Sequence, residues 1–316
     1  MTKPSSLSIS LDDLYPKTLS VVHHMARTLM GIQPGEQLPT IQDWMATTVA
    51  GAGTIQAGLA ILEKAGAIQV TSRGGQGSVL QDRALDRLWE FSGLSSLIGA
   101  LPLPYSLEFQ GIATALEREF QVQNLPVHLV YVNGSDVRFD GLLHQRWDFV
   151  VTSRWVAERF VSTHEAMIVH HFSAGTYYAK NSVGVLRRAD DPEAIRTVGR
   201  DESSGDHRAL SEAEFSNVRW VNVPYGQLPW VIHRRTVDAA IWHSTALTPM
   251  GIMDDLTIAP LQQDNAKELA ERMNEAVIVA RRAIDATHHV LHALRVDAME
   301  AMHAAVIAGD TIPFYG

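Results

Sequence analysis

The sequence predicts an α/β protein: an N-terminal winged helix-turn-helix, then a larger domain in which strands and helices alternate. In residues 38–80, two short helical patterns separated by glycines precede two strand patterns, which is the order of a winged helix-turn-helix. Beyond Ser95, apolar strand-like runs alternate with amphipathic helical runs, a pattern typical of a parallel α/β sheet. The length of 316 residues allows two domains, and 46% hydrophobic residues is ordinary for a globular protein.

Composition and charge exclude several classes of protein. The chain has no cysteine, which excludes disulfides, thiol catalysis and cysteine-ligated metal sites. Residues 1–15 lack the apolar region of a secretory signal, and no apolar run approaches membrane-spanning length, so we expect a cytoplasmic protein without membrane contact. A net charge of −9 argues against a protein that coats nucleic acid, but it is compatible with a dimer that reads DNA through one small patch.

The N-terminal helices are predicted from the spacing of apolar residues and from residues that cap or end helices. Residues 1–12 are expected to form a tail, and apolar residues at helical spacing predict a first helix over 16–30. Thr40 can N-cap the next helix, whose core-facing residues are predicted to be Ile41, Trp44 and Met45.

A second short helix is predicted after a turn containing Gly51 and Gly53, with Ile55, Leu59 and Leu62 on one face and Gly66 at its end. Strands at 67–71 and 78–80 then flank a glycine-rich hairpin tip, which completes a wing. The second helix of such a module enters the major groove of DNA.

Three segments resemble the DNA-binding domain of GntR-type bacterial transcription regulators: QPGEQLPT (33–40), GTIQAGLAILEKAGAI (53–68) and SRGGQGSVL (72–80). The resemblance implies that Thr54 and Gln56 approach the bases while Thr40 and Arg73 touch the backbone or minor groove. The expected DNA-binding residues are therefore Thr40, Thr54, Gln56, Arg73, Gly75 and Gln76.

Two departures leave a second interpretation open. GntR-type regulators usually carry a Ser-Arg pair where this chain has Gly51 and Ala52, and arginine is the commonest reader of guanine. Residues 1–80 carry five basic and five acidic side chains, where a DNA-binding domain normally has a basic face. The winged helix can alternatively serve dimerisation or packing, with DNA readout lost.

The rest of the chain is predicted to contain a linker helix over 83–94 and a ligand-binding domain over 95–316, after a DNA-binding domain over 1–82. Strands are expected at 96–104, 127–132, 148–153, 166–172, 178–188, 218–223, 237–242, 258–260 and 276–280. Helices are expected at 108–120 and 154–160, with a helix start at 193–198, a helix or loop at 225–233, and helices on both sides of 276–280.

This larger region resembles the C-terminal domain of the YhfZ family of bacterial regulators. The residues that carry the resemblance are LPLPYSLEFQGIATAL, WDFVVTS, VGRDESSGDHRALSEAEF, VDAAIWHS and NEAVIVA. The resemblance implies a domain like type 2 periplasmic binding proteins, with two α/β lobes and a small ligand between them. In this context the domain would sense an effector inside the cell.

Candidate ligand residues lie at strand-to-helix junctions, where helix N-termini offer free amides. Three junctions carry a serine, at Ser106, Ser153 and Ser204, each of which can contact a ligand or simply cap its helix. Arg154 can pair with a carboxylate or phosphate. Further candidates are the acidic residues Asp201 and Asp206, the aromatic residues Tyr105, Tyr177 and Trp242, and the strand-end His243, with core packing or capping as the alternative for each.

Metal and enzyme chemistry find no support in the sequence. His288 and His292 share a helix face, but no carboxylate completes a known metal motif. There is no GxSxG, P-loop or dinucleotide fingerprint, so no catalytic residue, metal or cofactor is predicted. We therefore expect a homodimeric, ligand-responsive transcriptional regulator that binds DNA and a small effector, anionic through a carboxylate or phosphate. The alternative is a small-molecule-binding protein, or an enzyme, whose winged helix no longer reads DNA.

Overall fold

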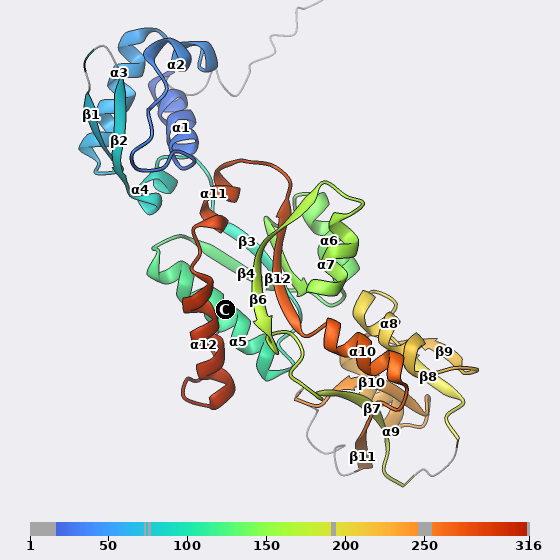
Figure 1. The fold of residues 1–316 in the computed structure, drawn as a ribbon. Helices are drawn as coiled ribbons and strands as arrows, with labels where there is room; N and C mark the ends of the chain where they lie inside the picture. Colours follow the sequence, from blue (N-terminus) through green and yellow to red (C-terminus); the bar gives the residue numbers. More distant parts are fainter. Residues whose placement is uncertain (1–16, 73, 75–76, 191–193, 246–254, 315–316) are drawn as a thin grey trace, which may run out of the picture. The chain divides into compact units, whose positions relative to one another are not determined.

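A computed structural model describes residues 17–72, 74, 77–190, 194–245 and 255–314. The described chain forms two compact units (Figure 1). One gathers the residues up to Ser95 together with Gln123–Leu125 and Ile284–Val290, and the other contains the remainder. In the described part, no single helix has the length and apolarity to cross a membrane, although the pair α2–α3, bent by 103°, passes the same test by length and composition.

The first unit has the predicted order of helix, turn, helix and hairpin. Its elements are α1 (Lys17–Leu29), α2 (Ile41–Thr47), α3 (Ala52–Lys64), β1 (Ile68–Ser72), β2 (Ser78–Arg83) and α4 (Leu85–Glu90). α1 crosses α3 closely, since a Cβ on Gly58 would lie 3.0 Å from Met25 Sδ. Trp44, Ile55 and Leu62 are buried beside them, and the predicted winged helix-turn-helix is confirmed.

Two details of this unit were predicted wrongly. Met45, which was predicted to face the core, is 42% exposed. α2 has only seven residues, and of its predicted core-facing residues it buries Trp44. Gly53 lies inside α3, and Gly51 alone forms its N-cap, because the turn between the helices ends two residues earlier than the glycine spacing indicates.

A reciprocal capping box begins α2. Thr40 Oγ1 accepts from the Asp43 amide at 3.2 Å, while Asp43 Oδ2 accepts from the Thr40 amide at 2.8 Å. Hydrogen bonds from the Thr40 hydroxyl and amide lower the pKa of Asp43. Such a box satisfies two amides that a helix start otherwise leaves free.

The second unit contains two α/β lobes. The first lobe is a five-stranded sheet in the order β4-β3-β5-β12-β6. Helices α5 and α12 pack along one face, and α6 and α7 cover the other (Figure 1). The bounds are β3 (Leu97–Leu101), α5 (Leu107–Val122), β4 (Val127–Tyr131), α6 (Ser135–Leu143), β5 (Phe149–Ser153), α7 (Arg154–Val161), β6 (Ala166–Ala174), β12 (Glu275–Arg281) and α12 (Val296–Ala308). Most of α11 (Ala286–His292) belongs to the first unit, which includes Ile284–Val290.

The second lobe is a five-stranded sheet in the order β11-β7-β10-β8-β9. Side chains alternate between the two faces of β10, so the second lobe has a core on each face of its sheet. Ala240 and Trp242 pack with α9 on one face, whereas Ala239 and Ile241 pack with α8 and α10 on the other. The bounds are β7 (Val183–Arg188), β8 (Thr197–Arg200), α8 (Gly205–Glu214), β9 (Arg219–Asn222), η3 (Tyr225–Gln227), α9 (Leu228–His233), β10 (Ala239–His243), β11 (Leu256–Pro260) and α10 (Asp264–Arg272).

Both sheets are mixed, so the prediction of a parallel sheet holds only for part of each: β3 is parallel to β4 and β5, and β8 is parallel to β9 and β10. β12 runs antiparallel to β5 and β6, because the chain returns from the second lobe in the opposite direction. β7 is likewise antiparallel to β10 and β11. The helix start predicted at 193–198 is also wrong: Ala194–Arg196 belong to no helix, and Thr197 begins β8, where Val198 is buried between β9 and β10.

Two segments carry the chain between the lobes, one after β6 and one before β12. The carbonyl of Asn274 accepts from the amides of Gly175 at 2.9 Å and Tyr177 at 3.0 Å. Thr176 Oγ1 accepts from the Ala276 amide at 3.0 Å. The two segments therefore hold each other through backbone hydrogen bonds.

The contact between Gly141 of α6 and Trp147 provides a test of packing. A Cβ on Gly141 would lie 1.9 Å from the Trp147 ring, so we expect Gly141→Ala to destabilise its unit by about 1–3 kcal/mol through overpacking. The matched control is Gly53→Ala in α3, where a Cβ meets nothing within 4 Å. That change should be neutral or stabilise by ~0.5–1 kcal/mol. Differential scanning calorimetry measures both, and equal effects would contradict the close Gly141–Trp147 contact.

Candidate functional site

The two lobes meet where three elements of the second unit begin or end: the start of α6, the end of β5 and the start of α8. The Gly205 amide donates to Ser135 Oγ at 2.9 Å, and the Asp136 amide donates to the Ser203 carbonyl at 3.0 Å. Arg208 forms an ion pair with Asp136 at 2.7 Å at the rim. The helix starts that offer free amides are thus turned toward each other across the junction.

Ser153 and Asp206 form a buried bond across this junction. Ser153 Oγ accepts from the Val156 amide at 3.3 Å, capping α7, and donates to Asp206 Oδ1 at 2.6 Å. Asp206 is 1% exposed, and burial raises its pKa to about 7, although the Ser153 hydrogen bond and the positive charge of Arg138 oppose the rise. Asp206 is therefore poised to change charge near neutral pH.

Asp201 has the opposite environment. Its carboxylate accepts from Asn133 Nδ2 at 2.7 Å, from the Ser203 amide at 2.9 Å and from the Tyr225 amide at 2.9 Å. Burial alone would raise its pKa, but these hydrogen bonds and one from the Ser203 hydroxyl outweigh burial and lower it. Asp201 is an ionised carboxylate that ties β8 to the first lobe.

A small hollow of about 50 Å³ lies beside these bonds. Aromatic rings dominate its walls, and Asn133, Arg138, Ser204 and His207 supply polar groups. Burial raises the pKa of Tyr177 to about 12 and raises that of Tyr178 and Tyr225 as well, so these phenols remain neutral hydrogen-bonding groups. The aromatic residues that line the hollow are Tyr105, Phe109, Tyr177, Tyr178 and Tyr225.

A second buried group contains Glu108, His243 and Thr245. Glu108 Oε2 accepts from Thr245 Oγ1 at 2.5 Å and lies 3.4 Å from His243 Nε2. Burial raises the pKa of Glu108, but hydrogen bonds from His243 and Thr245 and the charge of His243 outweigh burial and lower it to about 2. This group joins α5 of the first lobe to the end of β10 in the second.

The predicted ligand residues divide between the hollow and structural positions. Tyr105, Tyr177 and Ser204 line the hollow. Ser106 and Ser153 cap α5 and α7, while Asp201, Asp206 and His243 are bonded between the lobes. Trp242 stacks on Tyr225 in the core, with ring centroids 4.4 Å apart.

Arg154 lies outside the hollow. Its guanidinium pairs with Glu158 at 2.7 Å and with Glu275 at 3.0 Å, and these contacts raise its pKa. The arginine that does line the hollow is Arg138 of α6, and sequence reasoning missed it together with Asn133 and Tyr225. The signal available for Arg138 was its position three residues after Ser135, in the first turn following a strand end.

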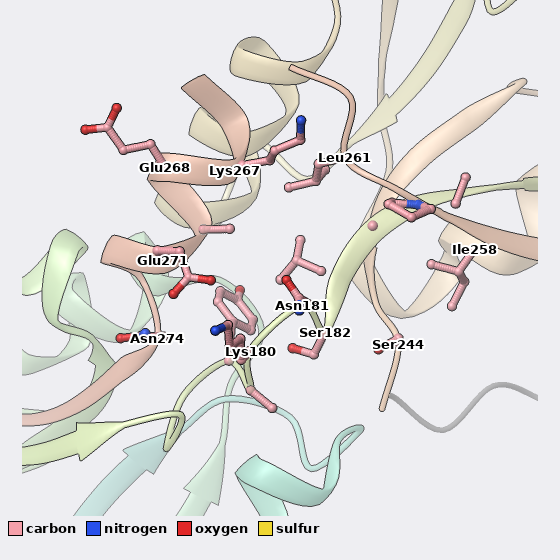
Figure 2. Close-up of a pocket in the computed structure, with 17 residues that line it drawn as sticks. Lys180, Asn181, Ser182, Ser244, Ile258, Leu261, Lys267, Glu268, Glu271 and Asn274 are labelled. Atoms are coloured by element: carbon pink, nitrogen blue, oxygen red, sulfur yellow. The ribbon is translucent and has the colours of Figure 1, made fainter. Parts of the chain in front are cut away.

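A larger hollow of about 610 Å³ lies within the second unit, between α10 and strands β7 and β11 (Figure 2). Lys180, Asn181 and Ser182 come from the segment that crosses between the lobes, and Glu271 faces them from α10 (Figure 2). The hydroxyl of Ser182, which is 4% exposed, has no partner among the described residues. None of these residues was predicted from the sequence to bind a ligand.

The predicted DNA-binding residues lie on the first unit. Thr40 is the N-cap of α2, so its side chain already accepts one hydrogen bond. Gln56 is exposed on α3 and Thr54 is half-buried. Arg73, Gly75 and Gln76 lie outside the described residues.

Within the described ranges, no group of three or more histidine, aspartate or glutamate side chains is arranged to hold a metal ion.

Comparison with known proteins identifies the family. Residues 85–315 match the YhfZ C-terminal domain, and residues 33–80 match a helix-turn-helix domain. The chain belongs to the YhfZ family. YhfZ of Escherichia coli (strain K12) is 28% identical over 299 residues, covering 93% of this chain and 96% of that protein. The family resemblance read from the sequence is therefore confirmed.

A solved structure of a YhfZ protein agrees with this assignment. The crystal structure of YhfZ from Shigella flexneri aligns with a TM-score of 0.56 and 25% identity, covering 73% of this chain and 98% of that one. AbpA from Streptococcus pneumoniae, an amino acid ABC transporter substrate-binding protein bound to L-arginine, aligns with a TM-score of 0.44 and 14% identity over 68% of this chain and 90% of its own. The predicted fold class, a helix-turn-helix joined to two α/β lobes, is confirmed for this YhfZ family member.

The raised pKa of Asp206 gives a pH-dependent stability. The folded protein keeps this proton up to about pH 7, whereas the unfolded chain releases it near the ordinary value of 3.8. The wild type should therefore lose stability relative to Asp206→Asn as the pH rises from about 5 to about 7, by at most ~3 kcal/mol, and the difference should level off above that range. Urea unfolding across this pH range measures the difference.

The control for that experiment is Asp238→Asn. Burial raises the pKa of Asp238, but hydrogen bonds from the Arg196 and Thr197 amides outweigh burial and lower it. Its contribution to stability is present above pH 3.8 and is lost only as the pH falls further. Parallel curves for wild type and Asp206→Asn between about pH 5 and 8 would contradict the environment described for Asp206.

Proposed function

We propose that this YhfZ family member is a cytoplasmic, homodimeric transcriptional regulator whose affinity for DNA responds to a small effector bound between its two lobes. The observation that carries the proposal is one chain that joins a helix-turn-helix domain to a two-lobed domain with a polar and aromatic hollow at the lobe junction. Pockets of that composition, at the ends of strands in α/β sheets, are typical ligand sites.

The mechanism that we propose is a population shift. The junction contains bonds that persist only while the lobes are close, such as Ser153–Asp206 and Asn133–Asp201. An effector that adds contacts to both lobes favours this closed arrangement by its differential affinity. In a dimer, closure changes the separation of the two winged helices and hence their fit to half-sites about 34 Å apart.

A second candidate function is a small-molecule-binding protein whose winged helix does not read DNA. The observation that favours it is the exposed surface at the start of α3, which consists of Ala52, Gly53, Gln56 and Ala57. No cation lies in α3 before Lys64 in its last turn. With so few cations, phosphate contacts and the salt dependence of binding would both be small.

Gln56 provides the test of direct readout. We expect Gln56→Ala to weaken specific DNA binding by about 1–3 kcal/mol, since a glutamine can bond adenine at two positions. The measurement is fluorescence anisotropy on the upstream DNA of its own gene at two salt concentrations, with a scrambled duplex for comparison. Gln69→Ala, an exposed glutamine of β1, is the matched control and should bind as the wild type does. No preference over scrambled DNA at either salt would favour the second candidate.

Ala52→Arg distinguishes the two candidate functions by adding a DNA-contacting side chain, where Gln56→Ala removes one. It places arginine at the exposed start of α3, where GntR-type regulators usually carry one, and should raise affinity for guanine-containing sites at least ~5-fold. Ala60→Arg adds the same charge to another exposed position of α3 and controls for non-specific attraction. Equal gains on specific and scrambled DNA for both variants would argue that α3 does not lie in the major groove.

A further inference from the structure

Arg138 is a buried cation whose partners in the described structure are all neutral. The residue is 3% exposed. Nη1 donates to the Val132 carbonyl at 2.8 Å, and Nη2 lies 3.4 Å from the Tyr177 hydroxyl. Nε has no hydrogen-bond partner among the described residues. One edge of the guanidinium, formed by Nε and Nη2, is therefore almost unused.

Such an arrangement is costly without an anion. A buried charge loses its hydration, and the loss is usually offset by a paired and hydrogen-bonded counter-ion. Asp206 is the nearby acid, but its protonation near neutral pH leaves the positive charge of Arg138 only partly balanced. Asp201 is committed to donors from Asn133, Ser203 and Tyr225.

We infer that Arg138 is the counter-ion for the carboxylate group of a ligand bound in the hollow between the lobes. This inference rests on the proposed effector site and names the chemistry of its ligand. A planar carboxylate accepts two parallel bonds from one edge of a guanidinium, which matches the unused Nε and Nη2. Arg138 lines the hollow from α6, and Tyr177 lines it beside Nη2.

The volume and lining of the hollow also limit the size, charge and polarity of the ligand. A volume of about 50 Å³ admits little more than the carboxylate head while the lobes are closed. The walls beyond Arg138 are rings, among them Tyr105, Phe109 and Tyr225, which suit an apolar or aromatic body. A phosphate dianion fits poorly, because the ionised Asp201 lies at the same junction and repels the second charge. The site therefore favours a monocarboxylate.

A purely structural role accounts for only part of this geometry. The Arg138 carbonyl accepts from Trp147 Nε1 at 2.6 Å, and the Nη1 bond closes the end of β4 through Val132. Both contacts fix the position of α6. Neither uses Nε, and neither supplies negative charge.

Isothermal titration calorimetry on the full chain tests the inference with a short series of probes: acetate, benzoate, the neutral isostere benzamide, and inorganic phosphate. We expect a monocarboxylate to bind and to raise the melting temperature, while benzamide and phosphate bind at least tenfold more weakly. Arg138→Gln should weaken the carboxylate at least tenfold, which corresponds to about 1.4 kcal/mol. Arg138→Lys, which keeps the charge but loses the fork and is the milder change if Arg138→Gln does not fold, should give an intermediate loss.

Arg154→Gln is the matched control, since it removes an arginine of the same lobe that is exposed and already paired with Glu158 and Glu275. It should bind the probes as the wild type does. Unchanged carboxylate binding in folded Arg138→Gln, equal binding of benzamide, preference for phosphate, or no carboxylate binding at all would each overturn the inference. Carboxylate binding that depends on Arg138 in a protein without DNA preference would instead sustain it and reject the regulator.

Discussion

The carbonyl of Asn274 joins the two segments that connect the lobes of the second unit. It accepts from two amides of the segment that leaves the first lobe, so the outgoing and returning chains are bonded side by side. The two crossing segments are the covalent connections between the lobes, so their mutual hydrogen bonds constrain how one sheet lies against the other. In the proposed mechanism these segments are the hinge, since two-lobed domains close around ligands about a few connecting residues.

Several contacts between the lobes are made by polar side chains that lie at the starts of helices. Ser153 caps α7 and also bonds Asp206, and Ser135 begins α6 and also accepts from the Gly205 amide. Side chains that satisfy helix ends thus also join the lobes. The junction also contains an acid, Asp206, whose pKa burial raises to about 7, and an arginine, Arg138, whose Nε has no hydrogen-bond partner among the described residues. In the proposed mechanism, these are the two groups through which a proton or a ligand acts on the lobes.

Local signals predicted most of the fold. The strand at Phe149–Ser153, its serine cap and the helix from Arg154 follow one another in sequence, and each confirms the next. α6 escaped prediction because SDVRFDGLL has weak amphipathicity and follows a glycine, Gly134, at the N-cap, and Arg138 was missed with it. The direction of β12 and the pairing of Glu108 with His243 depend on contacts between distant residues, which no local pattern records. Several of the ligand residues named from sequence lie at the lobe junction, and helix orientation decides which of them line its hollow.

The position of β12 also governs how the chain folds as it is made. β12 lies between β5 and β6 in the first lobe, although it is the last strand of the unit to leave the ribosome. Until residues 275–281 emerge, β6 has no neighbour in that sheet and β5 presents an open edge. The second lobe, whose strands β7 to β11 are all synthesised earlier, can complete its own sheet first. Nascent chains therefore carry an unpaired strand edge while residues 154–281 are synthesised, and such edges are where aggregation begins and where chaperones act.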